Sequence, residues 1–541
     1  MAPSASAVAL LAVASFLLEE TTAPVHEGRT RTEWLEELRA GDVAARRRAV
    51  YALWKIGASV LAGDREGTLA VADALSDEED YVADVAGRIL VRSGAAAADA
   101  ADAAVAALED DRPKVRAAAV RVIRAGLPRS SHAAGSLLSR LDDPSAEVRR
   151  ETATTLGQMA YALLGSGFAA QVVSGLADCL GDPDAPVRKE AAFALTAFGE
   201  AALPAVDALL ACLGDPDAGV RAFSANVLWS LGPAAGRSAL DGLYGIRGDA
   251  DADVRSRAYG GIVAVGPDDP RLFDAMREGI DDPSGSVRQT CSWILGQRFG
   301  DRPGVAEALR RAARDDHAPV RVNALLGVAR GRPVSADALR VVGEGLRDRD
   351  AQVRNAAAQA AGSIGPGAAR LTPLLVDMLR DSEGFGERAA TTALGRIGPG
   401  ALEAIPELRV RWLRRRDPYD RAAAGAALAR VSPGDLDAVL RELIGALGGG
   451  SAGLTPSIAA SAAGEIGPAA APAAVPALRP LLRAEDPILR TNAVVALGKF
   501  GPAAAECVPE IAALADDSDP GVARRAREAL DAIRGSGGAG R

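Results

Sequence analysis

The chain has 541 residues and a formal net charge of −9; hydrophobic residues make up 48% of it and aromatic residues only 4%. Its core must therefore be built largely from small Ala, Leu and Val side chains. The negative charge argues against a nucleic-acid-binding stripe, which needs clustered positive charge on one face. By length alone we would expect about three or four globular domains, but an internal repeat indicates one continuous array instead.

Residues 1–27 precede the repeats and contain an apolar run from Ala7 to Leu18, which is short for a membrane span. The length of this run suits the hydrophobic region of a secretory signal, although no Lys or Arg precedes it. We expect an export signal cleaved near Ala23 to His26, or a helix that docks on the first repeat; a membrane anchor is the third alternative. Export or a cell-envelope location is thus slightly favoured over the cytoplasm.

The segment Gly181–Arg188 (GDPDAPVR) returns 33 residues later as Gly214–Arg221 (GDPDAGVR). A fixed period of this length is typical of stacked repeats. Fifteen such units follow one another, most of them 33 to 35 residues apart, and six residues before the Arg position most units have an Asp. The Arg position of each unit is called its anchor here: Arg46, Ala83, Arg116, Arg149, Arg188, Arg221, Arg255, Arg288, Arg321, Arg354, Glu387, Arg421, Pro456, Arg490 and Ala523.

Each unit is predicted to contain two helices. The first is an apolar stretch such as Ala202–Leu210, with Pro in its first turn, where a missing N–H costs nothing. A Gly-Asp-Pro turn follows, and its Asp, for example Asp182, is expected to cap the second helix. That helix is predicted to run from Val187 to about Phe198 and to end at Gly199. No strand-like alternation of useful length appears, so the chain is predicted to be all-α.

The pattern Asp-x-x-x-x-Val-Arg-x-x-Ala-x-x-x-Leu-Gly-x-x-Gly resembles the HEAT-like repeats named after phycobilisome lyases. The resemblance implies a right-handed α-solenoid of about fifteen two-helix repeats over residues 28–534, followed by a Gly-rich tail at 535–541. It also implies that Asp and Arg side chains form a ladder between units. A guanidinium with five donors needs acceptors, and the Asp six residues earlier can reach it or its neighbour. The predicted ladder residues are Asp182, Arg188, Asp215, Arg221, Asp249, Arg255, Asp282, Arg288, Asp315, Arg321, Asp348 and Arg354.

Two kinds of enzyme share this repeat type, the phycobilin lyases and the deoxyhypusine hydroxylases. The hydroxylase resemblance requires several His-Glu pairs to hold two irons. Here the histidines are His26, His132 and His317, and only His26 is followed by Glu. The four cysteines form no C-x-x-C pair. We therefore expect no catalytic residue, metal or cofactor, and keep an accessory or catalytic factor of the bilin-lyase type as the alternative.

A partner-binding surface is predicted on the second helices. Positions +1, +5 and +8 after the anchor lie about opposite the apolar stripe, and Trp54, Trp229 and Trp293 all fall on this set. Aromatic and Arg side chains dominate interface hot spots. The alternative is that these side chains fill gaps between second helices, which is favoured for Phe223 and Tyr259. The candidate binding residues are Phe193, Asn226, Trp229, Trp293, Lys189 and Arg150.

These observations predict a non-catalytic scaffold that binds a protein or peptide along the concave face of the solenoid. Phe193, Trp229 and Trp293 are expected to form one strip there, with Lys189 and Arg150 adding positive charge at one end. No nucleic acid is expected as a partner, and no membrane beyond the N-terminal segment.

Overall fold

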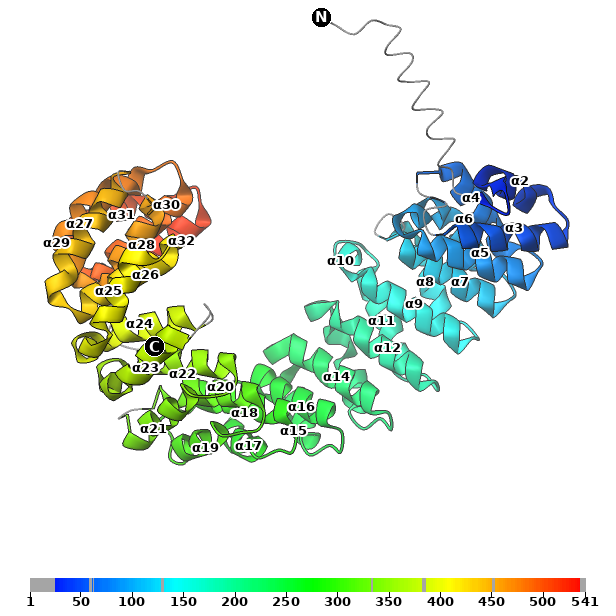
Figure 1. The fold of residues 1–541 in the computed structure, drawn as a ribbon. Helices are drawn as coiled ribbons and strands as arrows, with labels where there is room; N and C mark the ends of the chain where they lie inside the picture. The colour runs from blue at the N-terminus through cyan, green and yellow to red at the C-terminus, as the bar shows by residue number, and fades with distance from the viewer. Residues whose placement is uncertain are drawn as a thin grey trace, which may run out of the picture. The chain divides into compact units, whose positions relative to one another are not determined.

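A computed structural model describes residues 25–57, 61, 63–127, 131–331, 334–381, 386–449 and 453–535. The predicted export or docking segment lies outside the described residues, apart from its last three positions, and so does the tail after residue 535. The chain divides into two compact units, Met1–Leu272 and Phe273–Arg541. Each unit is a stack of helices, from blue to green for the first unit and from green to red for the second (Figure 1).

The first unit begins with a short hairpin in which β1 (Val25–His26) pairs antiparallel with β2 (Arg29–Thr30). Trp34 donates from Nε1 to the His26 carbonyl at 3.2 Å, so the hairpin is tied to the first helix. The α-helices that follow are α2 (Arg31–Ala40), α3 (Val43–Ile56), α4 (Arg65–Asp73), α5 (Asp80–Arg92), α6 (Ala101–Ala107), α7 (Pro113–Ala125), α8 (Ala134–Leu138), α9 (Ala146–Gln158), α10 (Ala160–Leu163), α11 (Ala169–Cys179), α12 (Ala185–Thr196), α13 (Val206–Cys212), α14 (Ala218–Leu231), α15 (Gly236–Gly245) and α16 (Ala252–Val265). The 3-10 helices are η2 (Ala74–Ser76), η3 (Gly94–Ala100), η4 (Ser131–Ala133), η5 (Ser139–Asp142), η6 (Gly199–Ala205) and η7 (Gly232–Ala235).

The second unit continues the same alternation of helices, and its first helix starts one residue before the unit boundary. Its α-helices are α17 (Leu272–Gly279), α18 (Gly285–Arg298), α19 (Val305–Ala312), α20 (Ala318–Val328), α21 (Ala336–Gly345), α22 (Ala351–Ile364), α23 (Thr372–Asp381), α24 (Glu387–Ile397), α25 (Ile405–Arg414), α26 (Pro418–Val431), α27 (Leu436–Leu447), α28 (Pro456–Ile466), α29 (Ala471–Leu478), α30 (Pro487–Phe500), α31 (Val508–Ala513) and α32 (Pro520–Arg534). The 3-10 helices are η8 (Gly365–Leu371), η9 (Gly398–Ala404), η10 (Pro433–Asp435), η11 (Pro468–Ala470), η12 (Arg479–Arg483), η13 (Gly501–Cys507) and η14 (Leu514–Asp516).

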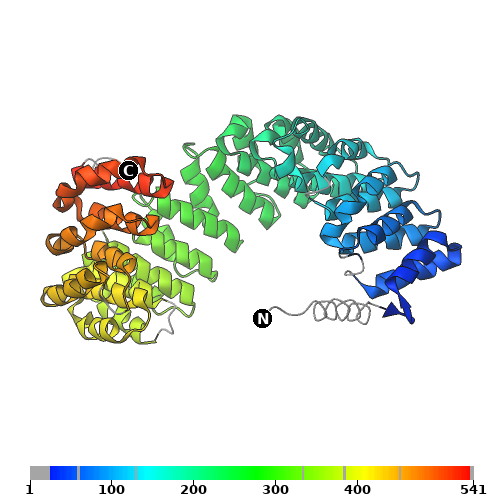
Figure 2. The same ribbon diagram turned by 90° about the horizontal axis from the view of Figure 1, so that it is seen from above.

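The helices of each unit form two layers. In the first unit, the second helices of successive repeats, from α3 to α16, pack against one another in sequence. The second helices from α18 to α32 do the same in the second unit, as both views show (Figure 2). The described residues contain fifteen such second helices, and each carries one of the fifteen anchors. The all-α solenoid predicted from the period is therefore confirmed.

The turn between the two helices of a repeat differs from the prediction in one respect. The N-cap of α12 is Asp184, whose side chain accepts from the Val187 N–H at 3.2 Å, and not Asp182. Asp182 instead accepts from the backbone N–H of Asp184 at 2.8 Å, which fixes the turn. The predicted cap was therefore wrong by two residues. In this repeat the Asp six residues before the anchor thus fixes the turn, and the Asp two residues later caps the helix.

Small residues allow the second helices to approach each other closely. Gly157 of α9 faces Ala194 of α12, and a Cβ on Gly157 would lie 2.9 Å from the Ala194 Cα. Gly395 of α24 faces Ala427 of α26 in the same way, at 3.0 Å. The +8 position of these helices was predicted to face outward, but at these glycines it is a contact between neighbouring second helices. Ala and Gly at such contacts explain how a chain with few aromatic residues builds a continuous core.

Candidate partner-binding surface and the ladder that supports it

An Arg–Asp ladder joins second helices to the repeats that follow them. Arg188 donates from Nε and Nη2 to both carboxylate oxygens of Asp215, at 2.7 and 2.9 Å. Its third nitrogen, Nη1, donates to the carbonyl of Asp182 in its own repeat at 2.8 Å. One guanidinium thus closes its own turn and also binds the carboxylate of the next turn. The sequence had left open whether the Arg would bind the Asp of its own repeat or that of a neighbouring repeat.

The same arrangement recurs along both units. Arg221 binds Asp249 at 2.7 Å and the Asp215 carbonyl at 2.8 Å. The bond from Arg221 lowers the pKa of Asp249, against the opposing effect of burial, and the bond from Asp249 raises the pKa of Arg221. Shortest N–O distances of 2.6–2.8 Å are found for the pairs Arg46–Asp77, Arg116–Asp143, Arg149–Asp182, Arg288–Asp315, Arg321–Asp348 and Arg490–Asp517.

The remaining predicted ladder residues take part through their own turns. Arg255 donates to the Asp249 carbonyl and Arg354 to the Asp348 carbonyl, both at 2.9 Å. The carbonyl of Asp282 accepts from Arg288, also at 2.9 Å.

At the first break in the ladder, a different Arg supplies the missing guanidinium. Ala83 of α5 has no side chain that could bind Asp110 of the next turn. Arg112 binds Asp110 instead, at 3.0 Å from Nε and 2.9 Å from Nη2, and donates to the Asp77 carbonyl at 2.7 Å. These are the two acceptors that an Arg at position 83 would have by analogy with Arg188. The link is kept, although the side chain comes from the other repeat.

At a second break, both members of the Arg–Asp pair that would form a rung of the ladder are absent. Pro456 is the anchor of α28, and six residues before the next anchor, Arg490, the chain has Ala484. The Ala484 carbonyl accepts from Arg490 Nη1 at 2.8 Å, so the turn itself is closed as in the other repeats. No charged group is left without a partner by this loss, because neither side of the rung carries one.

The candidate aromatic residues lie exposed on second helices. Phe193 of α12, Trp229 of α14 and Trp293 of α18 are 51%, 44% and 49% exposed. The Trp229 ring also lies against Gly260 of α16, where a Cβ would be 2.9 Å from the ring. Trp229 therefore both packs and presents an apolar face to solvent. Tyr259 is buried, so its predicted packing role is confirmed.

A chain of side-chain contacts links three consecutive second helices of the first unit. Phe193 meets Phe223 of α14 edge to face, with ring centroids 5.2 Å apart. Arg257 of α16 lies over the Phe223 ring at 5.3 Å and donates to Asn226 Oδ1 at 2.9 Å. Asn226 is thus held by its neighbour, and the Arg257–Asn226 bond fixes the surface beside Trp229.

The extension of this surface to the full predicted strip stays a prediction. Trp293 belongs to the second unit, whereas Phe193 and Trp229 belong to the first. The Lys189 stem packs against Gly219 of the next repeat. Arg150 lies 3.4 Å from Glu151, so part of its charge is compensated. The structure places Phe193, Asn226 and Trp229 on neighbouring helices, and the binding role of all six residues stays a prediction.

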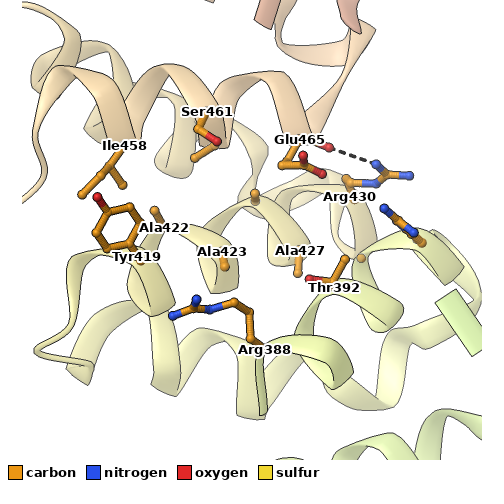
Figure 3. A pocket seen from close by; sticks show the side chains of 14 residues that line it. Arg388, Thr392, Tyr419, Ala422, Ala423, Ala427, Arg430, Ile458, Ser461 and Glu465 are labelled. Atoms are coloured by element: carbon orange, nitrogen blue, oxygen red, sulfur yellow. Dashed lines mark hydrogen bonds between the residues drawn. The ribbon is translucent and has the colours of Figure 1, made fainter. Parts of the chain in front are cut away.

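Sequence reasoning missed a depression on α24, α26 and α28 (Figure 3). It has a volume of about 290 Å³ and a floor of small residues that includes Ala422, Ala423 and Ala426. Tyr419 and Ile458 lie beside each other at one end, and Arg430 lies beside Glu465 at the other. The sequence does contain a sign of this depression: position +5 is a small residue in three consecutive repeats, namely Thr392, Ala426 and Ser461. Small side chains leave space on that face of the helices.

The structure also bears on metal binding and on the reactivity of the cysteines. Within them, no group of three or more His, Cys, Asp and Glu is placed to hold a metal ion. All four cysteines are buried, and burial raises the pKa of Cys179 to about 12. Such thiols are poor nucleophiles at neutral pH. In the described part of the chain, no helix is both long and apolar enough to span a bilayer.

Paired helices and the ladder between them define an α-solenoid of stacked repeats. The sequence matches the family of HEAT repeats over residues 134–229, 173–259, 240–330, 312–395, 339–429 and 452–531. These matches cover more than half of the chain, which therefore belongs to the HEAT repeat proteins. The match is to HEAT repeats in general, and the phycobilisome-lyase subtype stays a prediction. Among curated proteins, no relative matches the sequence.

Solved structures with a similar fold include importins. Importin beta crystallised from polyethylene glycol has a TM-score of 0.55 and 14% identity, over 99% of this chain and 84% of importin beta. Kap95p in a study of its binding to RanGDP has a TM-score of 0.53 and 14% identity, over 93% of this chain and 76% of Kap95p. Yeast importin beta (Kap95p) has a TM-score of 0.51 at the same identity and coverage. At this identity the likeness concerns the fold alone.

Proposed function

We propose that this protein is a non-catalytic scaffold that binds a protein or peptide partner on the face formed by its second helices. The observation that carries this proposal is the exposure of Phe193, Trp229 and Trp293 on that face. Large aromatic side chains half open to water cost free energy unless a partner covers them, and they are the residue types of interface hot spots. Stacked repeats also present a long surface rather than a closed pocket.

The importin likeness supports the same class of function. Kap95p, one of the structures with this fold, binds RanGDP. A HEAT solenoid can therefore act by binding another protein, and we propose binding of this general kind here, without assigning the importin partners to this chain. No observation favours the bilin-lyase alternative. We also propose export to the cell envelope, from the apolar run at residues 7–18.

The double variant Trp229→Ala with Trp293→Ala tests the proposal. Partners captured from an extract by the wild-type chain are identified by mass spectrometry, and capture of the same partners by the variant is then measured. Truncating two aromatic anchors typically costs about 2–4 kcal/mol each in binding, so capture should be abolished. The melting curve should change little, because both side chains are about half exposed.

A matched control removes two exposed hydrophobic side chains outside the second-helix face. Tyr161 lies on α10 and Leu413 on the first helix α25, one in each unit, and both are exposed. Tyr161→Ala with Leu413→Ala should leave capture unchanged. Capture that survives the Trp double variant, or a large fall in its melting temperature, would assign the tryptophans to packing and contradict the proposal.

A further inference from the structure

The depression on α24, α26 and α28 continues into a second one over α20, α22 and α24. The two share Arg388, Thr392 and Arg396, and the second has a volume of about 550 Å³. Together they form a groove that crosses consecutive second helices of one unit, which we call the basic groove. Its floor is made of small side chains such as Ala358 and Ala426, so a ligand chain can lie close to the helices.

The charges that line the basic groove are almost all positive. Among the described lining residues there are four arginines and one acid: Arg330, Arg388, Arg396, Arg430 and Glu465. This is notable in a protein whose net charge is −9. An excess of one sign on a hollowed surface attracts ligands of the other sign.

Most of this positive charge is not compensated by neighbouring carboxylates. Lys499 forms an ion pair with Glu465, so the one acid of the lining is already neutralised. Arg430 donates to the Glu465 carbonyl at 2.9 Å, a neutral acceptor. Within the described residues, no carboxylate lies within 4.0 Å of Arg330, Arg396 or Arg430. Arg388 is the exception, because it binds Asp420 at 2.9 Å.

Within the depression on α24, α26 and α28, the end opposite to Arg430 holds the side chains of Tyr419 and Ile458, and Asp420 beside Tyr419 is paired with Arg388. Tyr419 is 62% exposed at the start of α26, and Ile458 lies beside it at the start of α28 (Figure 3). Arg396 and Arg430 lie near the C-terminal ends of α24 and α26. Arg430 follows Tyr419 by eleven positions, which correspond to about 16 Å along a helix. An extended peptide covers this distance in about four or five residues, at roughly 3.3 Å each.

We infer that the basic groove binds an extended, acidic segment of a partner protein. An apolar side chain of that segment packs against Tyr419 and Ile458. A carboxylate four or five residues away along the peptide accepts hydrogen bonds from Arg396 and Arg430, which suit planar carboxylates. This inference rests on the proposed scaffold function and names the chemistry of one partner. A peptide is favoured over single-stranded nucleic acid, because the groove offers one aromatic ring and no series of stacking platforms.

Peptide display on the immobilised full-length chain tests the inference. A library of twelve-residue random peptides should yield binders that carry Asp or Glu four or five residues from an aromatic or aliphatic side chain. One fluorescein-labelled binder is then titrated by anisotropy. Arg396→Glu with Arg430→Glu should weaken its Kd by about tenfold or more, since charge-assisted bonds are lost and repulsion replaces them. Binding should also weaken as salt is raised.

Arg414→Glu with Arg416→Glu is the matched control, because it makes the same charge change in the same unit outside the lining. Its Kd should match that of the wild type. Should the loss of the Arg430–Glu465 bond unfold the double variant, Arg396→Glu alone still gives the test, since the Arg396 side chain makes no hydrogen bond to the described residues. Binders without acidic residues, or a Kd unaffected by Arg396→Glu, would overturn the inference.

Two further outcomes separate this inference from the proposed function. If the Trp229→Ala, Trp293→Ala variant loses its partners while the groove variants bind every peptide as the wild type does, the scaffold proposal stands and the basic groove is rejected. If no peptide is enriched and no protein is captured, both fail. A (dT)20 oligonucleotide that binds more tightly than any selected peptide, and is lost on Arg396→Glu, would overturn the assignment to a peptide.

Discussion

Glu387 on α24 accepts from Arg415 of the following turn, with Arg415 Nε 3.0 Å from Glu387 Oε1. Glu387 stands at the anchor position and Arg415 six residues before the next anchor, so the charges of the rung are exchanged relative to Arg321–Asp348. A second cation, Arg411, lies with its Nε 3.0 Å from the same Glu387 oxygen. An ion pair between repeats can therefore form with its two charges in either order.

Glu387→Ala should be one of the most destabilising single changes in the second unit. It leaves Arg415 without its carboxylate and the buried Arg411 paired with Glu407 alone. Removing one partner of a buried ion pair typically costs up to about 3–5 kcal/mol. Arg415→Ala should cost about 1 kcal/mol or less, because Arg415 is more exposed and Arg411 still neutralises Glu387. Urea unfolding of the two variants gives the comparison. Equal losses would show that Arg411 does not contribute to the rung.

Arg112 supplies the guanidinium that Ala83 lacks, and this role can be moved back to position 83. Arg112→Ala should destabilise the first unit by about 1–3 kcal/mol, because Asp110 loses both of its side-chain donors from Arg112. Adding Ala83→Arg to that variant restores the guanidinium from the position that supplies it in most repeats. The double variant should recover most of the loss in urea unfolding. A double variant less stable than Arg112→Ala alone would show that the space beside Ala83 cannot hold an Arg side chain.

The repeat period was enough to predict the number of repeats and the residues of the ladder. Each repeat folds under the same local constraints, so an Asp and an Arg that recur at fixed positions must meet equivalent partners. The exchanged rung at Glu387 was not predictable in this way. Arg415 does not belong to the recurring pattern, and its partner becomes evident only when the neighbouring repeat is placed beside it. The cap at Asp184 was missed because two Asp residues in one turn compete for the same role.

The surface was predicted less well than the core. Helical periodicity places Trp229 on the outer face, but it cannot show that the Trp229 ring rests on Gly260 of the next helix. The basic groove was overlooked for a related reason. Its floor consists of small side chains, which do not stand out in a search for large or charged residues. Its arginines Arg396 and Arg430 occur one repeat apart at +9, a position that the predicted outward set did not include.

Loss of one ladder Arg should have a local effect. Arg221→Ala removes the two guanidinium donors to Asp249, which keeps the Asp251 backbone N–H, and one donor to the Asp215 carbonyl, at a cost of about 1–3 kcal/mol. Repeats contact only their neighbours, so amide exchange should increase around α14 and α16 and stay unchanged near α2 and α3. Mass spectrometry of hydrogen exchange measures this. A uniform increase along the first unit would indicate that the repeats unfold together.

The ladder carboxylates predict how stability depends on pH. Arg188 and Arg221 hold the pKa values of Asp215 and Asp249 below their usual range, although burial opposes this. A carboxyl whose pKa is lower in the folded state stabilises the fold above its unfolded pKa of about 3.9, and this contribution is lost as the pH falls through the folded value. The urea midpoint should therefore be constant from pH 7 to pH 5 and fall below about pH 4. A fall between pH 7 and pH 5 would point to other titrating groups.

Two glycines of the second unit should respond to alanine with opposite signs. Gly464 lies on α28 against α30, where a Cβ would be 2.9 Å from the Ala496 Cα. Gly464→Ala must push the two helices apart, and overpacking of this kind typically costs about 1–3 kcal/mol. Gly445 lies within α27, and a Cβ there would meet no atom within 4 Å. Gly445→Ala should therefore stabilise the helix, by up to about 1 kcal/mol, since Ala is the better helix former. Thermal unfolding of the two variants, beside the wild type, gives both signs in one experiment. A stabilising Gly464→Ala would mean that the second helices can separate without cost, and close helix contact would then not be what selects Gly at the +8 position.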